Sequence, residues 1–316
     1  MSYRGLSVAL TIPCFNEEAA IAQVIRDFRS AMPGIAIYVF DNNSTDNTAA
    51  VARAEKAAVI SVPLAGKGNV VRRMFADVES DIYVMVDGDS TYDAPSVTRM
   101  VDKLIDEHLD MVVGCRQATE EVASAAYRSG HQWGNRMLTQ STVNIFGGGF
   151  TDMLSGYRVF SKRYVKSFPA LSHGFEIETE LTVHALELRM PYGEVMTPYY
   201  ARPEGSESKL STYRDGLRIL KTIFRLYVSE RPFAFYGIWG ALLALLSITI
   251  SVPVVAEYFR TGLVPRFPTL ILSASMTVCA LLSFTCGLIL DNVTTGRHET
   301  KRLAYLTIPF RTVDRS

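Results

Sequence analysis

The chain has 316 residues, enough for one large domain or two smaller ones. Its 32 basic and 32 acidic residues cancel, so no bulk electrostatic attraction to nucleic acid is expected, and we predict no nucleic-acid partner. The four cysteines show no metal-ligand spacing and are interpreted as reduced or buried thiols of an intracellular or membrane protein.

The first part of the chain alternates between strand-like and helix-like segments. The strand-like runs lie at residues 6–12, 35–40, 59–62, 82–86 and 111–113. The segments between them predict helices at residues 17–31, 46–57, 69–78 and 96–107. This rhythm predicts an α/β domain with a mostly parallel sheet and helices on both faces. In such sheets, ligands bind outside the carboxyl ends of the strands.

Two carboxylates one residue apart, Asp87 and Asp89, follow the fourth strand-like run. Ionised side chains held this close repel each other unless a positive charge intervenes. Mg²⁺ or Mn²⁺ would supply that charge, because both prefer hard oxygen ligands and share their shell with substrate phosphates. Gly88 would let the chain bend so that both carboxylates reach one ion. A plain polar turn is the alternative, but polar clusters at residues 13–18 and 41–46 would lie at the same sheet edge and favour a site.

Two stretches further along the chain, at residues 233–256 and 267–290, contain no charged residue. Each is about 24 residues long and would form a helix of roughly 36 Å, longer than the roughly 30 Å hydrocarbon core of a bilayer. We therefore predict two transmembrane helices, joined as a hairpin by residues 257–266. Lys and Arg residues cluster before the first helix and after the second, so the positive-inside rule predicts that these two ends face the cytoplasm.

A basic amphipathic segment precedes the first predicted span. Over residues 208–229, apolar residues recur at helical spacing beside a stripe of Arg and Lys. Such a helix lies in the membrane interface and attracts anionic lipid heads, whereas the alternative is an ordinary surface helix packed on the sheet.

The predicted organisation has four parts. They are a cytoplasmic catalytic domain at residues 1–205, a juxtamembrane amphipathic helix at 206–232, a transmembrane hairpin at 233–290 and a cytoplasmic tail at 291–316. The chain is thus expected to be a multi-pass protein of the inner (plasma) membrane. Small residues such as Gly237, Gly240 and Ala244 would let spans pack closely, as in a homo-oligomer.

Several short motifs resemble those of one enzyme family in their order and spacing. They are Pro13-Cys14-Phe15-Asn16-Glu17, Asp41-Asn42-Asn43-Ser44-Thr45-Asp46, Lys67, Asp87-Gly88-Asp89, Gly114-Cys115-Arg116, residues 152–158 and Ser208-Lys209-Leu210. Over roughly residues 6–230, the chain resembles an inverting family 2 glycosyltransferase with the Rossmann-like GT-A fold. The later motifs resemble the branch of dolichol-phosphate mannose synthases and polyprenyl-phosphate glycosyltransferases, and the paired spans resemble the membrane anchor of bacterial members.

The resemblance implies roles for the residues at the strand ends. A UDP- or GDP-linked hexose would be the donor, with Asp41 on its base or ribose and a metal held by Asp87 and Asp89 on its diphosphate. The expected nucleotide-binding residues are Pro13, Phe15, Glu17, Asp41, Lys67, Asp87, Gly88 and Asp89. Two positions depart from the family pattern: Asn42 replaces the usual second Asp, and Thr91 replaces a Gln that would be a third metal ligand.

The acceptor would be a polyprenyl phosphate, which is already anionic near neutral pH and needs no strong general base. It needs cations, because two phosphorylated substrates repel each other, and Arg donates two parallel hydrogen bonds to phosphate. The candidates are Arg116, Arg128, Arg158, Arg202 and Lys209. The expected catalytic residues are Asp87, Asp89, Arg158 and Glu176, the last of which the resemblance places on the acceptor side. Any one of these Arg residues could instead be a solvated surface charge, and Lys67 an ordinary loop lysine.

The leading hypothesis is a metal-dependent, inverting transfer of one hexose from a nucleotide sugar to a polyprenyl phosphate at the cytoplasmic membrane face. A glycosyltransferase acting on a lipid-linked glycan or polysaccharide is the first alternative, but the Gln-x-x-Arg-Trp motif of processive synthases is absent. A nucleotidyltransferase would show a glycine-rich loop after the first strand, and residues 13–18 contain no glycine. A non-catalytic membrane adaptor with the same fold is disfavoured by the acidic and arginine clusters.

Overall fold

The chain divides into two units, which are described separately. The computed structural model describes residues 2–119, 129–203 and 212–311. The first unit comprises Met1–Thr222 together with Lys301–Ser316, and the second comprises Ile223–Thr300. The chain therefore leaves the first unit once and contributes to it again near the C-terminal end.

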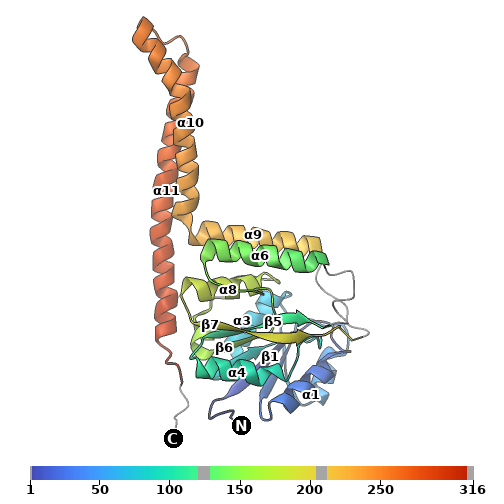
Figure 1. Ribbon diagram of the computed structural model, residues 1–316. Coiled ribbons are helices and arrows are strands. Elements are labelled where there is room, and N and C mark those ends of the chain that lie inside the picture. The colour runs from blue at the N-terminus through green and yellow to red at the C-terminus, as the bar shows by residue number, and fades with distance from the viewer. Residues whose placement is uncertain (1, 120–128, 204–211, 312–316) are drawn as a thin grey trace. The chain divides into compact units, whose positions relative to one another are not determined.

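A sheet forms the centre of the first unit (Figure 1). Among the described residues it has seven strands, in the spatial order β3 (Ala58–Ser61), β2 (Ala36–Asp41), β1 (Val8–Cys14), β4 (Ile82–Met85), β6 (Arg158–Ser161), β5 (Met111–Ala118) and β7 (Tyr192–Tyr199). Neighbouring strands are parallel, except that β6 runs antiparallel to both β4 and β5. The predicted mostly parallel sheet is confirmed, whereas β6 and β7 were not predicted.

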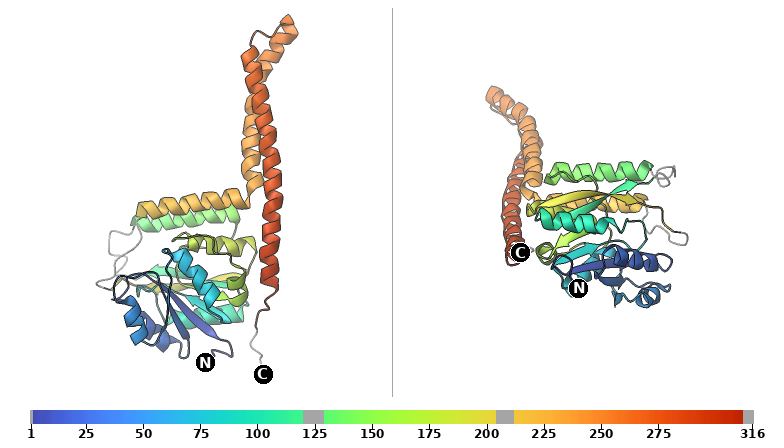
Figure 2. Two further views of the ribbon diagram at one scale, coloured as in Figure 1. Left: turned by 180° about the vertical axis from the view of Figure 1, so that it is seen from behind. Right: turned by 60° about the horizontal axis from the view of Figure 1, so that its bottom comes forward.

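Helices cover both faces of the sheet (Figures 1 and 2). One face packs against α1 (Ile21–Ala31) and α4 (Ser96–Asp106), which bury apolar stripes that include Ile25 and Val101. The other face packs against α3 (Lys67–Asp77), α7 (Lys162–Ser167) and α8 (Ile177–Glu187), with Phe75 and Tyr164 buried there. The remaining helices of this region are α2 (Thr48–Ala54) and α6 (Ser129–Phe146). Because a parallel sheet is buried on both faces, it needs these two apolar layers.

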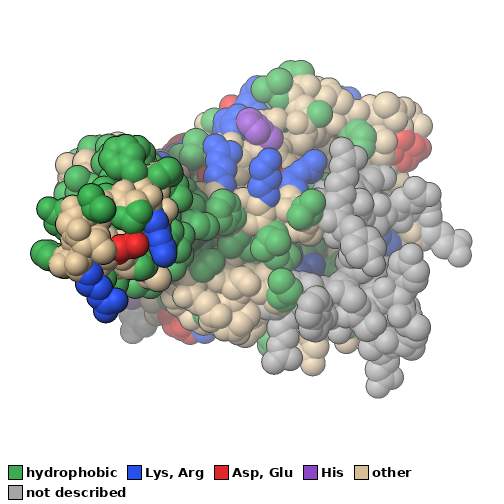
Figure 3. Space-filling model, turned by 90° about the horizontal axis from the view of Figure 1, so that it is seen from above, with side chains coloured by type: hydrophobic (Ala, Val, Ile, Leu, Met, Phe, Trp, Pro, Cys, Tyr) green, Lys and Arg blue, Asp and Glu red, His purple; other side chains and the backbone are tan. Residues whose placement is uncertain are grey.

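The predicted amphipathic segment forms α9 (Thr212–Glu230). Its buried side chains include Ile219 and Ile223, while Leu217, Leu220 and Phe224 of the predicted apolar stripe are exposed. On the face seen in Figure 3, Lys and Arg side chains gather next to hydrophobic ones. Part of the apolar stripe of α9 is therefore exposed and free to contact lipid, as is required of a helix that lies on a membrane surface.

The second unit is built around α10 (Pro232–Thr261) and α11 (Phe267–Leu306), both long and apolar enough to span a membrane. Small or polar buried residues recur every seven positions, at Gly240 and Ser247 on α10 and at Ser273, Ala280, Gly287 and Thr294 on α11. The Ser247 hydroxyl donates to the Ser273 carbonyl oxygen at 2.6 Å. Hydrophobic side chains dominate the outer surface of the hairpin (Figure 3). Small residues that allow close backbone approach are typical of helix pairs in lipid.

Two details of the hairpin differ from expectation. Helix α11 continues to Leu306, well past the predicted end of the span at residue 290. Gly240 packs within the hairpin, because a side chain there would meet the Phe284 ring at 3.0 Å. Since the hairpin itself uses this small residue, the homo-oligomer remains a prediction without support from Gly240.

Candidate active site

Three polar segments meet at the carboxyl edge of the sheet. Strand β1 pairs with β2 on one side, with Cys14 opposite Asp41, and with β4 on the other side, with Thr11 opposite Met85. Asp87 lies two residues beyond Met85. After β3 the chain returns to place β4 on the other side of β1, and such switch points open a ligand crevice at the carboxyl ends. The predicted convergence of residues 13–18, 41–46 and 87–89 at one edge follows from this strand order.

Lys67, the first residue of α3, points its ammonium group at two carboxylates. Its Nζ pairs with Asp87 Oδ1 and lies 2.6 Å from Glu178 Oε1. Burial alone would lower the pKa of Lys67, but the charges of Asp87 and Glu178 raise it overall. Lys67 therefore carries its positive charge between Asp87 and Glu178 and is not an ordinary loop lysine.

Asp89 is almost fully buried and has its own cationic partner. It accepts hydrogen bonds from the Thr91 hydroxyl at 2.6 Å and the Thr91 amide at 3.2 Å, and it pairs with the Arg202 guanidinium at 2.6 Å. Burial raises the pKa of Asp89, and the nearby Asp87 charge raises it further, while Arg202 lowers it. The two carboxylates thus disfavour joint ionisation, as their spacing in the sequence predicts.

The donor set fits a hard divalent cation. Asp87 and Asp89 offer carboxylate oxygens one residue apart, which suit Mg²⁺ or Mn²⁺. Within the described residues, no third His, Cys, Asp or Glu joins them closely enough to share an ion. The Thr91 hydroxyl donates to Asp89 instead of replacing the absent Gln as a ligand. Substrate oxygens and water would therefore complete the shell, as is usual for Mg²⁺.

Two glycines allow the segments of the site to approach closely. A side chain at Gly88 would meet Cys14 Sγ at 2.6 Å, and one at Gly156 would run into the Asp87 carboxylate. Gly88 does not adopt the left-handed backbone conformation, so it is needed for space against β1 and not for an unusual bend. Gly156 brings the loop before β6 directly against Asp87.

Asn42 connects the end of β2 to the segment that carries Lys67. Its Nδ2 donates to the carbonyl oxygens of Val62 and Leu64 at 2.9 and 2.7 Å, and its Oδ1 accepts from the Gly66 amide at 2.7 Å. An aspartate cannot donate to the two carbonyl groups. The departure from the family's second Asp therefore has a structural reason, since this position holds the loop that leads into α3.

The other expected nucleotide-binding residues surround the end of β1. Pro13 is half-buried, Phe15 is 44% exposed, and the Glu17 and Asp41 side chains are buried. Asp41 accepts a hydrogen bond from the Ser44 amide at 3.3 Å. These four side chains lie at the predicted edge, and their contact with a nucleotide remains a prediction.

The expected acceptor residues separate into different environments. Arg116 donates two hydrogen bonds of 2.7 Å to Asp152, so its planar fork already binds a carboxylate. Arg202 lies at the carboxylate pair. Arg128 and Lys209 lie outside the described residues. Of these cations, Arg202 is the one that the structure brings to Asp89.

Arg158 is not at the open edge, in contrast to its expected contact with the acceptor phosphate. It is fully buried, and its guanidinium donates to the carbonyl oxygens of Ser155, Met153 and Glu178 and to the Thr182 hydroxyl. Burial lowers the pKa of Arg158. Its place between β6 and α8 is explained by cross-linking these backbone segments, and we leave it out of the proposed acceptor site.

Glu178 lies beside Lys67, although the sequence analysis assigned it no role. Glu176, the expected residue, occupies the N-cap position of α8, but its side chain accepts a hydrogen bond from the preceding Gly174 amide, at 3.2 Å, and not from the helix. Glu178 is 4% exposed and reaches Lys67. Three glutamates alternate at the start of α8, and only the rotational setting of the helix on the sheet decides which one faces Lys67.

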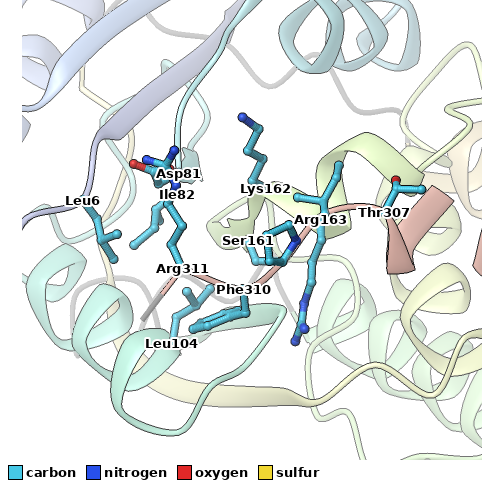
Figure 4. Close-up of a pocket in the computed structure, with 12 residues that line it drawn as sticks. Leu6, Asp81, Ile82, Leu104, Ser161, Lys162, Arg163, Thr307, Phe310 and Arg311 are labelled. Atoms are coloured by element: carbon cyan, nitrogen blue, oxygen red, sulfur yellow. The ribbon is translucent and has the colours of Figure 1, made fainter. Parts of the chain in front are cut away.

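A hollow of about 250 Å³ lies at the opposite edge of the sheet, between the start of β4 and residues 307–311 (Figure 4). Its cationic lining residues are already paired: Lys162 with Glu79, Arg163 with Asp110, and Arg311 with Asp81 at 3.1 Å. The Arg163 guanidinium also lies over the rings of Tyr305 and Phe310. The hollow is thus explained by the packing of the C-terminal segment.

Comparisons with known proteins agree with this fold. The sequence profile of Glycosyl transferase family 2 matches residues 10–168. Glycosyltransferase AglJ of Haloferax volcanii is 34% identical over 254 residues, which cover 80% of this chain and 82% of AglJ. The dolichyl-phosphate hexose transferase of the same organism is 26% identical over 225 residues, covering 71% of this chain and 95% of that protein.

A solved structure has the same fold. Glucosyl-3-phosphoglycerate synthase from Mycobacterium tuberculosis, in complex with UDP, superposes with a TM-score of 0.57 at 22% identity, covering 71% of this chain and 80% of that one. The fold and the sequence define a glycosyltransferase with a GT-A-type domain. The chain belongs to glycosyl transferase family 2, so the expected family, fold and enzyme class are confirmed.

Proposed function

We propose that this enzyme transfers a single hexose from a UDP- or GDP-linked sugar to a polyprenyl phosphate, with inversion at the anomeric carbon. The observation that carries the proposal is the pair of the half-buried Asp87 and the buried Asp89 at the switch point, with Lys67 and Arg202 as their cationic partners. A site that holds two acidic and two basic groups at a ligand crevice is suited to a diphosphate and its metal ion. The name of the dolichyl-phosphate hexose transferase relative supports the lipid acceptor.

Asp87 and Asp89 would hold a divalent cation against the donor diphosphate. When bound, this ion would offset the negative charge that develops on the departing nucleoside diphosphate. The solved glucosyl-3-phosphoglycerate synthase was crystallised with Mn²⁺ and UDP, in keeping with this class of donor. Lys67, paired with Asp87 and Glu178, would hold the Asp87 carboxylate in place from the start of α3.

The acceptor phosphate oxygen would attack the anomeric carbon from the side opposite the leaving group. The new bond is the one between this oxygen and the sugar, and the bond to the diphosphate breaks with its electron pair leaving on the nucleotide. No proton needs to be removed from the acceptor, because its phosphate is already anionic. Arg202, next to Asp89, would reduce the repulsion between the two phosphorylated substrates.

The membrane arrangement would deliver the lipid to this site. The exposed apolar and basic residues of α9 suit a position in the headgroup layer. Helices α10 and α11 would cross the plasma membrane with both outer ends in the cytoplasm, as their flanking Lys and Arg residues predict.

The test is a panel of UDP- and GDP-hexoses incubated with the purified full chain, a divalent cation and a C55 prenyl phosphate. We expect one sugar nucleotide to yield a lipid whose mass increases by one hexose, and EDTA to suppress the product. Transfer to a lipid-linked glycan but not to prenyl phosphate would favour the alternative acceptor. A complete lack of transfer and of nucleotide binding would favour the non-catalytic adaptor.

A further inference from the structure

Lys67 and its two carboxylate partners, Glu178 and Asp87, are buried to different degrees. The side chains of Lys67 and Glu178 are 9% and 5% exposed, whereas that of Asp87 is 28% exposed. Asp87 is therefore the member that faces the open sheet edge, and Glu178 contacts Lys67 from the interior. Among the described residues, Glu178 makes no hydrogen bond or ion pair with Asp87 or Asp89, and it contacts this part of the site through Lys67.

The approach of Lys67 to Glu178 is set by backbone packing. The Gly68 amide donates to the His173 carbonyl oxygen at 3.0 Å. Side chains at Gly66 and Gly68 would collide with the carbonyl oxygens of His173 and Ser172. The start of α3 thus lies directly against the segment that leads into α8, and the Phe175 ring lies 5.8 Å from Lys67 Nζ. The contact therefore joins two rigid elements and is not a chance meeting of two flexible side chains.

The charge balance explains what Glu178 adds. With Lys67 and Asp87 alone, one positive and one negative charge would cancel, and Asp87 would have little net attraction for a second cation. Glu178 supplies a second negative charge on the buried side, so the group of three carries a net charge of −1. The negative charge of Asp87 then remains effective toward a cation at the open edge.

We propose that Glu178 is a positioning residue that neutralises Lys67 and thereby keeps Asp87 available for the divalent cation of the donor diphosphate. This inference rests on the proposed function, because it assigns a purpose to a contact within the same site. It also explains why an interior carboxylate is kept beside a lysine that already has a partner. Outer-shell partners of this kind typically change metal affinity by roughly 10- to 100-fold when removed.

The experiment measures Mn²⁺ binding directly, from the electron paramagnetic resonance signal of free Mn²⁺, with the purified full chain and either UDP or GDP present. We expect Glu178→Gln to weaken Mn²⁺ binding by roughly tenfold. The matched control is Glu79→Gln, because Glu79 also pairs with a lysine, Lys162, at the opposite edge of the sheet. The control should bind Mn²⁺ like the wild type.

A double variant separates charge compensation from a purely structural role. In Lys67→Met/Glu178→Gln both interior charges are gone, so the group again has a net charge of −1, that of Asp87. Mn²⁺ binding should therefore return to within about threefold of the wild type. A structural role predicts instead that the double variant binds no better than Glu178→Gln. This variant also avoids an unpaired buried charge and is expected to fold, as checked by its circular dichroism spectrum.

The outcomes are distinguishable. If the wild type binds Mn²⁺ and Glu178→Gln binds it equally well, or if Glu79→Gln loses as much, the role of Glu178 is refuted while the proposed function stands. If the wild type binds no Mn²⁺ with either nucleotide, the metal dependence in the proposed function fails, and the role of Glu178 fails with it.

Discussion

Replacing Asn42 by Asp tests whether this side chain holds the loop that carries Lys67. Asn42 is 8% exposed, and its Nδ2 group donates hydrogen bonds to two carbonyl oxygens, those of Val62 and Leu64. In Asn42→Asp, a carboxylate oxygen would face both carbonyl groups, and neither would have its donor. Each lost partner of a buried group costs about 1–3 kcal/mol, so we expect a loss of about 3 kcal/mol in the free energy of unfolding.

The assay is thermal unfolding of the full chain in detergent, followed by circular dichroism. For a domain of this size, 1 kcal/mol shifts Tm by about 2–4 °C, so the expected decrease is about 6–12 °C. The KM for the sugar nucleotide should also rise, because the Gly66 amide is bound to the same side chain. Asn43→Asp is the matched control, since Asn43 makes one exposed hydrogen bond, to the Pro63 carbonyl oxygen at 2.8 Å.

The reasoning predicts a clear difference between these neighbouring positions. A Tm for Asn42→Asp within 2 °C of the wild type, or an equal loss in Asn43→Asp, would refute the role assigned to Asn42. A lower Tm with an unchanged KM would show that the loop keeps its position without this residue.

Three further outcomes are expected. Asp89→Asn should abolish metal-dependent transfer yet raise the Tm of the metal-free protein at pH 7. Because burial raises the pKa of Asp89, the ionised side chain destabilises the fold above that pKa, and the stability of the wild type increases as pH falls through it. A lower Tm of Asp89→Asn at pH 7 would contradict this. Arg158→Met should decrease stability by about 3–5 kcal/mol, because it leaves several buried carbonyl groups without donors, and in the fraction that folds KM for the prenyl phosphate should stay near the wild-type value; a selective rise in that KM would restore the acceptor assignment. Arg202→Gln should raise KM for the prenyl phosphate roughly tenfold and should also lower Tm, because the buried Asp89 loses its cationic partner. Product mass and unfolding curves would report these changes, and an equal rise in KM for the sugar nucleotide would argue against an acceptor role.

The periodic part of the fold could be predicted from the sequence. All five expected strands and all four expected helices of the first 113 residues occur, with ends shifted by a few residues. Strand β6 was missed because it has only four residues, begins with a buried Arg158, and gains its stability from pairing with both β4 and β5. Such a strand is defined by its neighbours and not by its own pattern.

The carboxylate pair was also predictable, because two acidic residues after a buried strand have few explanations other than a cation or a turn. The residues that contact this pair were harder to predict from the sequence. Glu178 and Arg202 are far from Asp87 and Asp89 in the chain, and nothing local distinguishes Glu178 from Glu176. Arg158 was expected at the acceptor because Gly156 allows close approach, but the structure places Gly156 against Asp87 and buries Arg158 completely.

The sequence by itself determined the α/β alternation, the acidic pair at a strand end and the two uncharged spans, because each depends on residues close together along the chain. Only the tertiary structure decided which charges face one another: strand order brings Asp41, Lys67 and Asp87 to one edge, and the setting of α8 turns Glu178 toward Lys67. The physical reason is that electrostatic partners are chosen by distance in space and by burial. Neither quantity can be obtained from spacing along the chain.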